Sequence, residues 1–424
     1  MRIVIMTSGS RGDVQPYIAL GLGLQRAGYQ VCILTHSIFA QMIERYGLEF
    51  APLTGNPRAM LETQKGQRFI ESGGNALRFI RDMVEMGKGQ QEAFMKDAQR
   101  TLPGADLLLY TSLCFVGSYV AEALHIPAIF APLQPIIPTR AFPYPIGRYY
   151  ELNGTGNRLT HLLGNLLIWQ TARPVMQPIR RKLGLEPIPW SGSITWLLKL
   201  RQPLLLGYSP LLVPQPTDWP KWVHATGYWF LDAPHDWRPP SPLLDFLEAG
   251  PPPVYIGFGS MASRNAEETV SIALKALERS KQRGIIATGW SNISNADLPD
   301  TVFKLEEAPH DWLFPRMAAV VHHAGSGTTA VGLRTGVPNI PVPFFVDQLF
   351  WAERVYRMGI SPRPIPHKHL TAENLAEAIT TAVSDHTLRT RAADLGVRIR
   401  AEDGVGNAVQ IVQNVLASHD GIYS

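Results

Sequence analysis

Residues suited to chemistry gather in the stretch HHAGSGTT, residues 322–329, where two histidines close an apolar run and a glycine-rich turn follows. A helix that starts after such a turn leaves backbone N–H groups unpaired at the positive end of its dipole. Glycines let an anion approach that backbone, and the neighbouring threonines and a histidine can donate to a diphosphate or carry charge toward it. The stretch therefore predicts an anion site, with a plain tight turn and a buried histidine as the alternative.

The turn has neither of two common phosphate-binding signatures. It lacks the GxGxxG spacing, and no acidic residue follows at the distance that the ribose of NAD requires. It also lacks the Gly-Lys-Ser/Thr of a Walker A loop. These absences exclude the two standard nucleotide-binding patterns at this position.

A second loop, GSRGDVQP, places Asp13 beside Arg11 at the start of a helical pattern. An acid at such a position commonly caps the helix. A carboxylate in a cleft can instead act as a general base, and Arg11 can hold a phosphate or tune that carboxylate. The sequence leaves both interpretations of Asp13 open.

A third stretch, PVPFFVDQLFWAERV, presents Asp347 and Gln348 after a stiff apolar approach. A neighbouring carboxylate and amide are the groups that adjacent hydroxyls of a sugar ring require. The alternative is a helix N-cap followed by an amphipathic helix. The first interpretation predicts a sugar-binding pair.

The elements that must position these loops alternate between short apolar runs and segments with helical spacing. RIVIMTSGS, QVCILTH, ADLLLYTS and PAIFAPL are the apolar runs of the first half, and PVYIGFGSM, RGIIATGW and AAVVHHAGSG restart the pattern in the second. This alternation predicts βαβ units and parallel sheets. Ligands of open parallel sheets bind beyond the carboxyl ends of the strands, where all three loops are expected.

The length of 424 residues exceeds what one core usually supports, so two α/β domains are expected. Four prolines between residues 210 and 220 predict a linker. We therefore assign residues 1–215 to a first domain, 216–403 to a second domain and 404–424 to a C-terminal helix.

Composition narrows the class of protein. The net charge is +4 with a sequence pI near 9.0, and no dense Lys/Arg block with interleaved aromatics indicates nucleic acid. Cys32 and Cys114 form neither a disulfide framework nor a metal-ligand spacing, which fits a reducing cytoplasm. No run reaches the roughly 18 apolar residues of a membrane span, and the N-terminal run is too short for a signal peptide.

One segment leaves a peripheral contact with the inner membrane surface open. Residues 58–96 mix apolar positions with basic ones, a pattern typical of a helix lying on an anionic bilayer. A solvated amphipathic helix packed on the first domain is the alternative. The segment contains the basic residues Lys65, Arg68, Arg78, Arg81 and Lys88.

Taken together, the motifs resemble the GT-B glycosyltransferases of family 1, above all their sterol 3-β-glucosyltransferase branch, with glycopeptide and macrolide glycosyltransferases as near relatives. The matching stretches are GSRGDVQPYIALGLGL, AGPPPVYIGFGSM, APHDWLFPRMAAVVHHAGSGTTAVGLRTGVP and PFFVDQLFWAERV. The resemblance covers nearly the whole chain and is tightest between residues 250 and 359.

The resemblance implies a GT-B fold with two Rossmann-like parallel α/β domains, the first binding the acceptor and the second the nucleotide sugar. The two domains face each other across a cleft that closes on the donor. The C-terminal helix crosses back to the first domain. It implies that Asp13 is the catalytic base and that His323 assists the leaving diphosphate. The donor-binding residues that it implies are Ser10, Arg11, Gly12, Ser260, Trp290, Ala308, His310, His323, Ala324, Gly325, Ser326, Gly327, Thr328, Asp347 and Gln348. Ser326 and Val331 stand where the plant small-molecule branch has tryptophan and glutamate, so the ribose rules of that branch do not transfer.

The implied reaction is an inverting, metal-independent transfer of a hexose, with glucose expected, from a UDP-sugar to a hydroxyl of a sterol or sterol-like alcohol. No cofactor is expected, because the UDP-sugar is a co-substrate. The stretch between residues 53 and 200, with the aromatic run PTRAFPYPIGRYY, suits a lipophilic acceptor site or simple packing. A TDP-sugar enzyme for a polyketide, carotenoid or other natural product, a UDP-sugar epimerase and a non-catalytic binder remain as alternatives.

Overall fold

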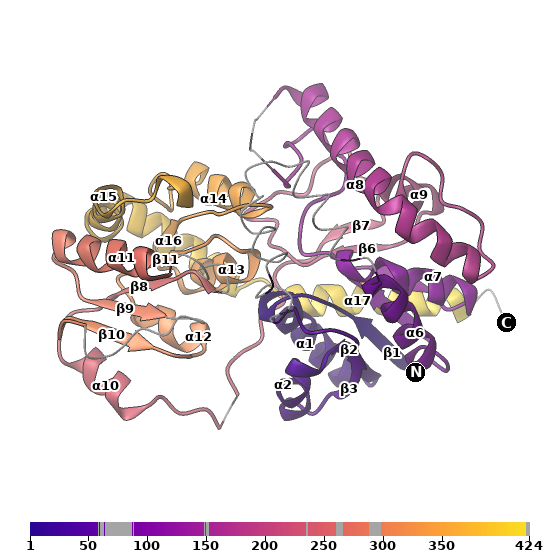
Figure 1. Cartoon of the computed structure of the whole chain (residues 1–424), viewed down its shortest axis with the longest axis horizontal. Coiled ribbons are helices and arrows are strands. Elements are labelled where there is room, and N and C mark those ends of the chain that lie inside the picture. The colour runs from indigo at the N-terminus through magenta and orange to yellow at the C-terminus, as the bar shows by residue number, and fades with distance from the viewer. Residues whose placement is uncertain are drawn as a thin grey trace. The chain divides into compact units, whose positions relative to one another are not determined.

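The computed structural model describes residues 1–57, 59, 63, 87, 89–147, 149, 152–234, 236–259, 266–287 and 298–420 (Figure 1). The chain divides into two compact units, of which the first joins Met1–Leu231 to Asp403–Ser424 and the second is Asp232–Glu402. Each unit has its own parallel sheet and its own core.

Unit 1 is built on a seven-stranded parallel sheet in the order β3-β2-β1-β4-β5-β6-β7. Its strands are β1 (Arg2–Met6), β2 (Gln30–His36), β3 (Glu49–Leu53), β4 (Leu107–Tyr110), β5 (Ala128–Phe130), β6 (Leu204–Leu206) and β7 (Val223–Ala225). A parallel sheet covered on both faces has no polar side, which is why residues 3–6 of β1 and all of β4 are buried.

The helices of unit 1 include one from the far end of the chain. They are α1 (Arg11–Arg26), α2 (Ala40–Arg45), α6 (Gln90–Thr101), α7 (Phe115–Ala123), α8 (Gly154–Lys182), α9 (Ser193–Leu200) and α17 (Gly404–Asp420). Ala408, Val412 and Leu416 of α17 enter the same core as Leu20 and Leu24 of α1. The C-terminal helix is therefore part of unit 1 (Figure 1).

Unit 2 is built on a five-stranded parallel sheet in the order β10-β9-β8-β11-β12. Its strands are β8 (Val254–Gly257), β9 (Gly284–Ala287), β10 (Val302–Leu305), β11 (Ala319–His322) and β12 (Asn339–Pro341). Its helices are α10 (Ser241–Glu248), α11 (Ala266–Ser280), α12 (His310–Leu313), α13 (Ser326–Thr335), α14 (Gln348–Arg357), α15 (Ala372–Ser384) and α16 (His386–Arg400). Because β8 and β11 are neighbours, the loops that follow them leave the sheet at one edge.

The division between the units falls after Leu231, beyond the boundary at residue 215 and beyond the prolines expected to form a linker. The reason is β7, whose Val223 pairs with Leu204 of β6 and so extends the first sheet. The proline-rich stretch accordingly lies inside unit 1.

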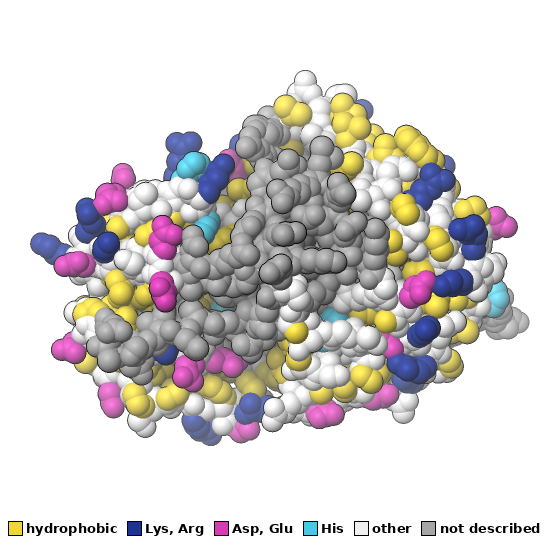
Figure 2. All heavy atoms as spheres, in the orientation of Figure 1, with side chains coloured by type: hydrophobic (Ala, Val, Ile, Leu, Met, Phe, Trp, Pro, Cys, Tyr) yellow, Lys and Arg dark blue, Asp and Glu magenta, His cyan; other side chains and the backbone are white. Residues whose placement is uncertain are grey.

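The surface of unit 1 retains apolar side chains over α8 and α9 (Figure 2). Among the described helices, none is both long and apolar enough to cross a bilayer. Cys32 and Cys114 are free thiols, and burial raises the pKa of each to about 12. The segment expected to lie on a membrane, residues 58–96, falls largely outside the described residues.

Candidate functional site

The loop between β11 and α13 leaves the start of α13 uncapped. Gly325 is the N-cap residue, in extended backbone and without a side-chain cap, and the Thr329 N–H donates to its carbonyl at 2.9 Å. The N–H groups of Ser326, Gly327 and Thr328 thus precede the first backbone hydrogen bond of α13. Uncapped donors at the positive end of a helix dipole can bind an anion, and the anion site expected from the sequence stays a prediction.

The backbone entering this helix is held in an uncommon conformation. Ala324 has φ of +60°, in the left-handed region that favours glycine, and its side chain is buried. Such a conformation costs about 1 kcal/mol or more and persists when its surroundings hold it. Here the holding contact is the Ala324 N–H, which donates to His322 Nδ1 at 3.0 Å.

His322 is a structural residue with a defined hydrogen position. Because Nδ1 accepts from Ala324, Nε2 carries the hydrogen and donates to Asn339 Oδ1 at 2.8 Å. Complete burial lowers the pKa of His322 to about 3. The first histidine of the pair therefore stays neutral and ties β11 to β12.

His323 differs from His322 in its hydrogen bonding. Its ring lies between two glycine turns, because a Cβ placed on Gly259 would lie 3.6 Å from His323 Cε1 and one on Gly325 would collide with Nε2. Its Nδ1 is buried and has no hydrogen-bond partner among the described residues. Burial lowers the pKa of His323 to about 4, so the ring is neutral near pH 7. It is suited to donate a hydrogen bond to a diphosphate rather than to carry a fixed charge.

Asp347 and Gln348 stand at the start of α14, directly after Val346, whose φ is +59°. Asp347 Oδ2 accepts from Trp351 Nε1 at 3.0 Å. Gln348 is buried, and its Oε1 accepts from the backbone N–H of Phe344 at 2.8 Å and of Phe345 at 3.3 Å. Both side chains thus stabilise their own loop, and the predicted sugar contact stays a prediction.

The chain that leads from β10 into α12 holds Ala308 and His310, two of the donor-binding residues that the resemblance implies. Ala308 is buried, and the His310 ring stacks on Phe314 at 4.4 Å. His310 Nε2 also lies 3.3 Å from the Tyr255 hydroxyl of β8. The imidazole is thus engaged within unit 2, and donor binding by Ala308 and His310 stays a prediction.

In unit 1, Asp13 closes the first turn of α1. The backbone N–H and the hydroxyl of Ser10 both donate to Asp13 Oδ2, at 2.8 and 2.9 Å. Gly9 makes this possible, since its φ is +132° and a Cβ there would collide with the carboxylate. Asp13 therefore serves as a cap, and its role as a base stays a prediction.

The surroundings of Asp13 extend to the loops after other strands. Burial chiefly raises the pKa of Tyr17 and of Cys114, and the negative charge of Asp13 raises both further. Cys114 belongs to the short 3-10 turn that follows β4. The carboxylate thus lies at the carboxyl edge of the sheet, as expected for a site in a parallel fold.

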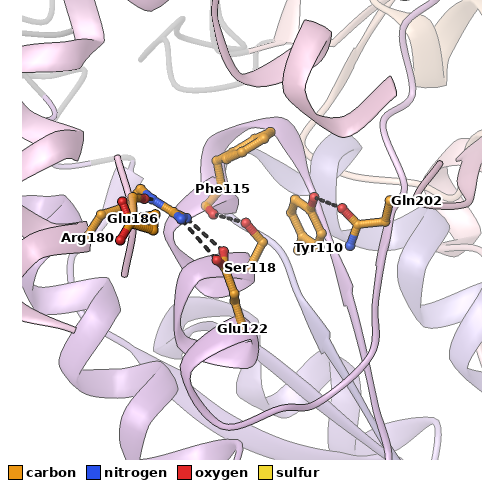
Figure 3. Close-up of polar contacts among 7 residues, drawn as sticks. All are labelled: Tyr110, Phe115, Ser118, Glu122, Arg180, Glu186 and Gln202. Carbon is orange, nitrogen blue, oxygen red and sulfur yellow. Dashed lines mark hydrogen bonds and ion pairs between the residues drawn. The ribbon is translucent and has the colours of Figure 1, made fainter. Parts of the chain in front are cut away.

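An aromatic group occupies the ends of β4 and β5. Tyr110 stacks on Phe130 at 5.2 Å, Phe115 meets both rings edge-on, and the Tyr110 hydroxyl reaches Gln202 Oε1 at 3.5 Å (Figure 3). Phe142 and Tyr144, from the predicted acceptor run, are buried around His161. For these two residues the packing interpretation holds.

Comparison with known proteins identifies the chain. Residues 3–143 match the glycosyltransferase family 28 N-terminal domain, and residues 282–414 match the erythromycin biosynthesis protein CIII-like C-terminal domain. The chain is 37% identical over 97% of its length to the sterol 3-beta-glucosyltransferase UGT80A2 of Arabidopsis thaliana, and 36% over 96% to UGT80B1 of the same plant. It belongs to the sterol 3-beta-glucosyltransferase family of glycosyltransferases.

The chain spans 65% and 67% of the lengths of those two plant proteins. It is 34% identical over 98% of its length to a sterol 3-beta-glucosyltransferase of Neosartorya fischeri, of which it spans 30%. Solved structures share its fold at low identity. The kitacinnamycin glycotransferase has a TM-score of 0.70 at 20% identity, covering 98% of this chain and 99% of that one. The calicheamicin glycosyltransferase CalG4 has a TM-score of 0.69 at 17% identity, covering 98% of each. These likenesses and the two parallel sheets confirm the GT-B fold that was predicted.

Two polar residues near Asp13, Ser8 and His36, were not singled out from the sequence. His36 Nδ1 lies 3.0 Å from the Gly55 carbonyl, which can only accept, so Nε2 accepts from Ser8 Oγ at 2.8 Å. Ser8 precedes Gly9, and the contact therefore pins the loop that carries Asp13 to the ends of β2 and β3. Ser8 and His36 could have been found from the sequence, because they follow or end β1 and β2, two adjacent parallel strands whose carboxyl ends lie together.

The remaining predicted donor residues are distributed unevenly. Ser260 and Trp290 lie outside the described residues. Ser10, Arg11 and Gly12 are in unit 1, exposed at the start of α1. The structure thus brings Gly259, His323 and the start of α13 together in unit 2.

Proposed function

We propose that this chain transfers a hexose, glucose first among the candidates, from a UDP-sugar to the hydroxyl of a lipophilic alcohol, a sterol or sterol-like molecule. The support is its 36–37% identity to named sterol 3-beta-glucosyltransferases over nearly its whole length. The single structural observation that carries the proposal is the uncapped start of α13 beside the neutral His323. A diphosphate leaving group needs such a site.

In the proposed reaction, unit 2 binds the donor. The amides of Ser326, Gly327 and Thr328 and the dipole of α13 stabilise the charge that builds on the β-phosphate, and His323 adds a hydrogen bond. Fixed dipoles of this kind stabilise a transition state without reorganising during the reaction. Asp347 and Gln348 are proposed to hold sugar hydroxyls.

Unit 1 is proposed to supply the base. Asp13 takes the proton of the acceptor hydroxyl as its oxygen attacks the anomeric carbon. The new bond joins that oxygen to the anomeric carbon, and the bond from this carbon to the β-phosphate oxygen breaks. UDP leaves with the electron pair, and attack opposite the leaving group inverts the α-linkage to β.

Metal independence belongs to the same proposal. Within the described parts of the chain, no three His, Cys, Asp or Glu side chains gather as metal ligands. The helix dipole and loop amides would neutralise charge that a divalent cation neutralises elsewhere. Turnover should therefore survive EDTA, and a loss restored by Mg²⁺ or Mn²⁺ would contradict this part.

The deciding experiment combines donor and acceptor panels. The protein is titrated with UDP and with TDP, then incubated with the corresponding glucose donors and with sterols, hopanoids or polyketide aglycones. We expect tighter UDP binding and β-glucoside formation on sterols. Glycosylation confined to polyketides with TDP-glucose would favour the natural-product alternative. Binding of UDP-sugar with neither glycoside formation nor UDP release on any acceptor would leave an epimerase or a non-catalytic binder.

A further inference from the structure

Helix α8 carries an exposed apolar stripe. Leu159, Leu162 and Leu163 are 52%, 44% and 56% exposed. Their spacing of three and four residues places them on one face of the helix. Single exposed leucines are ordinary on protein surfaces, but several on one face mark a site that contacts another apolar phase.

The stripe continues along the helix to a tryptophan. Gln170, seven residues after Leu163 and so on the same face, donates through Nε2 to the Trp190 carbonyl at 2.9 Å. The Trp190 side chain is 63% exposed. At 1.5 Å per residue, Leu159 and Gln170 lie about 16 Å apart along the axis. We call Leu159, Leu162, Leu163 and Trp190 the apolar stripe.

The charge around the apolar stripe is predominantly basic. The sequence of α8 contains five Lys or Arg residues and no Asp or Glu. Arg158 and Arg173, near the two ends of the apolar stripe, form no ion pair with a described residue. Between residues 152 and 201 the one acid is Glu186. The bias is local, since the whole chain has 39 basic and 35 acidic residues.

The helix is held firmly from beneath its C-terminal end. Arg180, which is 1% exposed, donates to both oxygens of Glu122 on α7, at 2.7 and 3.0 Å (Figure 3). Its Nε also donates to the Glu186 carbonyl at 2.7 Å. The first two bonds use the carboxylate of Glu122, and all three fix the C-terminal end of α8 to unit 1, so the apolar stripe lies on an anchored helix.

We propose that this face of α8 rests on an anionic lipid bilayer. Leucine side chains enter the boundary between headgroups and acyl chains, Trp190 lies at the level of the headgroups, and Arg158 and Arg173 meet anionic lipids. Figure 2 shows apolar and basic side chains together over this region. The residues of this proposal are other than those of the segment 58–96.

Charge favours lipid over a second copy of the chain. A two-fold dimer through this face would place equivalent arginines of the two copies on the same interface. Helix α8 itself offers no carboxylate to pair with them. An anionic membrane supplies the missing negative charge. Lipid binding does not depend on the proposed sugar transfer, although it would hold unit 1 where a lipophilic alcohol dissolves.

Vesicle flotation of the full chain tests the proposal. Phosphatidylcholine vesicles are compared with vesicles that also contain phosphatidylglycerol, at low and high salt. We expect binding to the anionic vesicles that weakens with salt. Replacing both Leu162→Glu and Leu163→Glu should reduce binding by about tenfold or more. Replacing Arg158→Gln and Arg173→Gln should remove most of the salt dependence.

The matched control is Val397→Glu, a change at a 59% exposed apolar residue of α16 in unit 2, which should bind vesicles as the wild type does. Thermal unfolding of each variant verifies that it folds. Absence of wild-type binding to anionic vesicles, or an equal loss in the control, would overturn the proposal. A dimer in sedimentation that the leucine changes dissociate would assign the face to a second copy.

Discussion

Two loops of this molecule share a strand–glycine–helix pattern but differ in how the first turn of the helix is capped. In unit 1, β1 leads through Gly9 into α1, and in unit 2, β11 leads through Gly325 into α13. The first helix start is closed by its own carboxylate, because Asp13 accepts from Ser10. The second has no side-chain cap.

This difference in capping suits the two loops to different chemical roles. A helix start that already carries a carboxylate disfavours a second anion and offers an oxygen that can take a proton. A start with unpaired amides and no negative side chain favours an anion from outside. One folding pattern thus supplies a candidate base in one unit and a candidate phosphate site in the other.

The largest expected effect is on turnover, in a variant that removes the proposed base role of Asp13 but keeps its capping role. Asn can still accept from Ser10, so Asp13→Asn should leave the melting temperature near that of the wild type. Without a base, turnover should fall by roughly 10²–10⁴-fold while UDP affinity is retained. Rates of UDP release, calorimetry and thermal unfolding measure the three quantities.

Asp13→Ala provides the contrast, because it removes the cap as well and should cost about 1 kcal/mol of stability. Near-normal turnover in Asp13→Asn would reduce Asp13 to a helix cap.

A second substitution gives the start of α13 a carboxylate like the one at the start of α1. Ser326→Asp places a carboxylate at the start of α13, where it should slightly stabilise the helix and repel a diphosphate. UDP affinity should fall by about tenfold to a hundredfold, because the new carboxylate repels the diphosphate by roughly 1.4–2.7 kcal/mol. Ser326→Asn is the neutral control. Equal UDP affinity in the two variants would mean that the diphosphate binds elsewhere.

Alanine substitutions at Gly9 and Gly325 form a matched pair with smaller expected effects on stability and UDP affinity. Gly9→Ala should cost about 1–3 kcal/mol in denaturant unfolding, because φ at Gly9 is +132° and the new Cβ would collide with Asp13. Gly325 has φ of −64°, which alanine adopts readily. There the new methyl group meets the His323 ring, so UDP affinity should fall more than stability. Similar stability losses in both variants would remove this contrast.

The smallest effect concerns pH. Burial lowers the pKa of His323 to about 4, below the value of about 6.5 expected in the unfolded chain. The unfolded state therefore binds the proton first, and the stability that the neutral ring contributes is complete above pH 6.5 and is lost as pH falls toward 4. Thermal unfolding of the wild type and of His323→Asn should converge as pH falls. Parallel curves would show that His323 titrates normally.

Local patterns were sufficient for the parallel α/β plan. The buried run of β1, the glycine turns at Gly9 and Gly325 and the helical spacing after them are properties of short segments. Side-chain period and turn chemistry act over a few residues, so they can be read without knowing the partners. The same locality explains why the anion site at α13 was predicted together with its helix.

Contacts between distant segments settled the rest. His322 and His323 are adjacent and chemically identical in the sequence, yet one is bonded to Asn339 of β12 and the other lies beside Gly259. The place of α17 in the core of unit 1 depends on α1, which lies at the other end of the chain.

The sequence by itself determined that strands would end in glycine turns at one edge of each sheet, and that an acid and a histidine pair would stand there. Only the tertiary structure decided that Asp13 caps its own helix, that His36 anchors the loop through Ser8, and that β7 moves the boundary to Leu231. The physical reason is that hydrogen bonds, burial and the resulting pKa values depend on which groups are neighbours in space. A one-dimensional pattern limits those neighbours without selecting them.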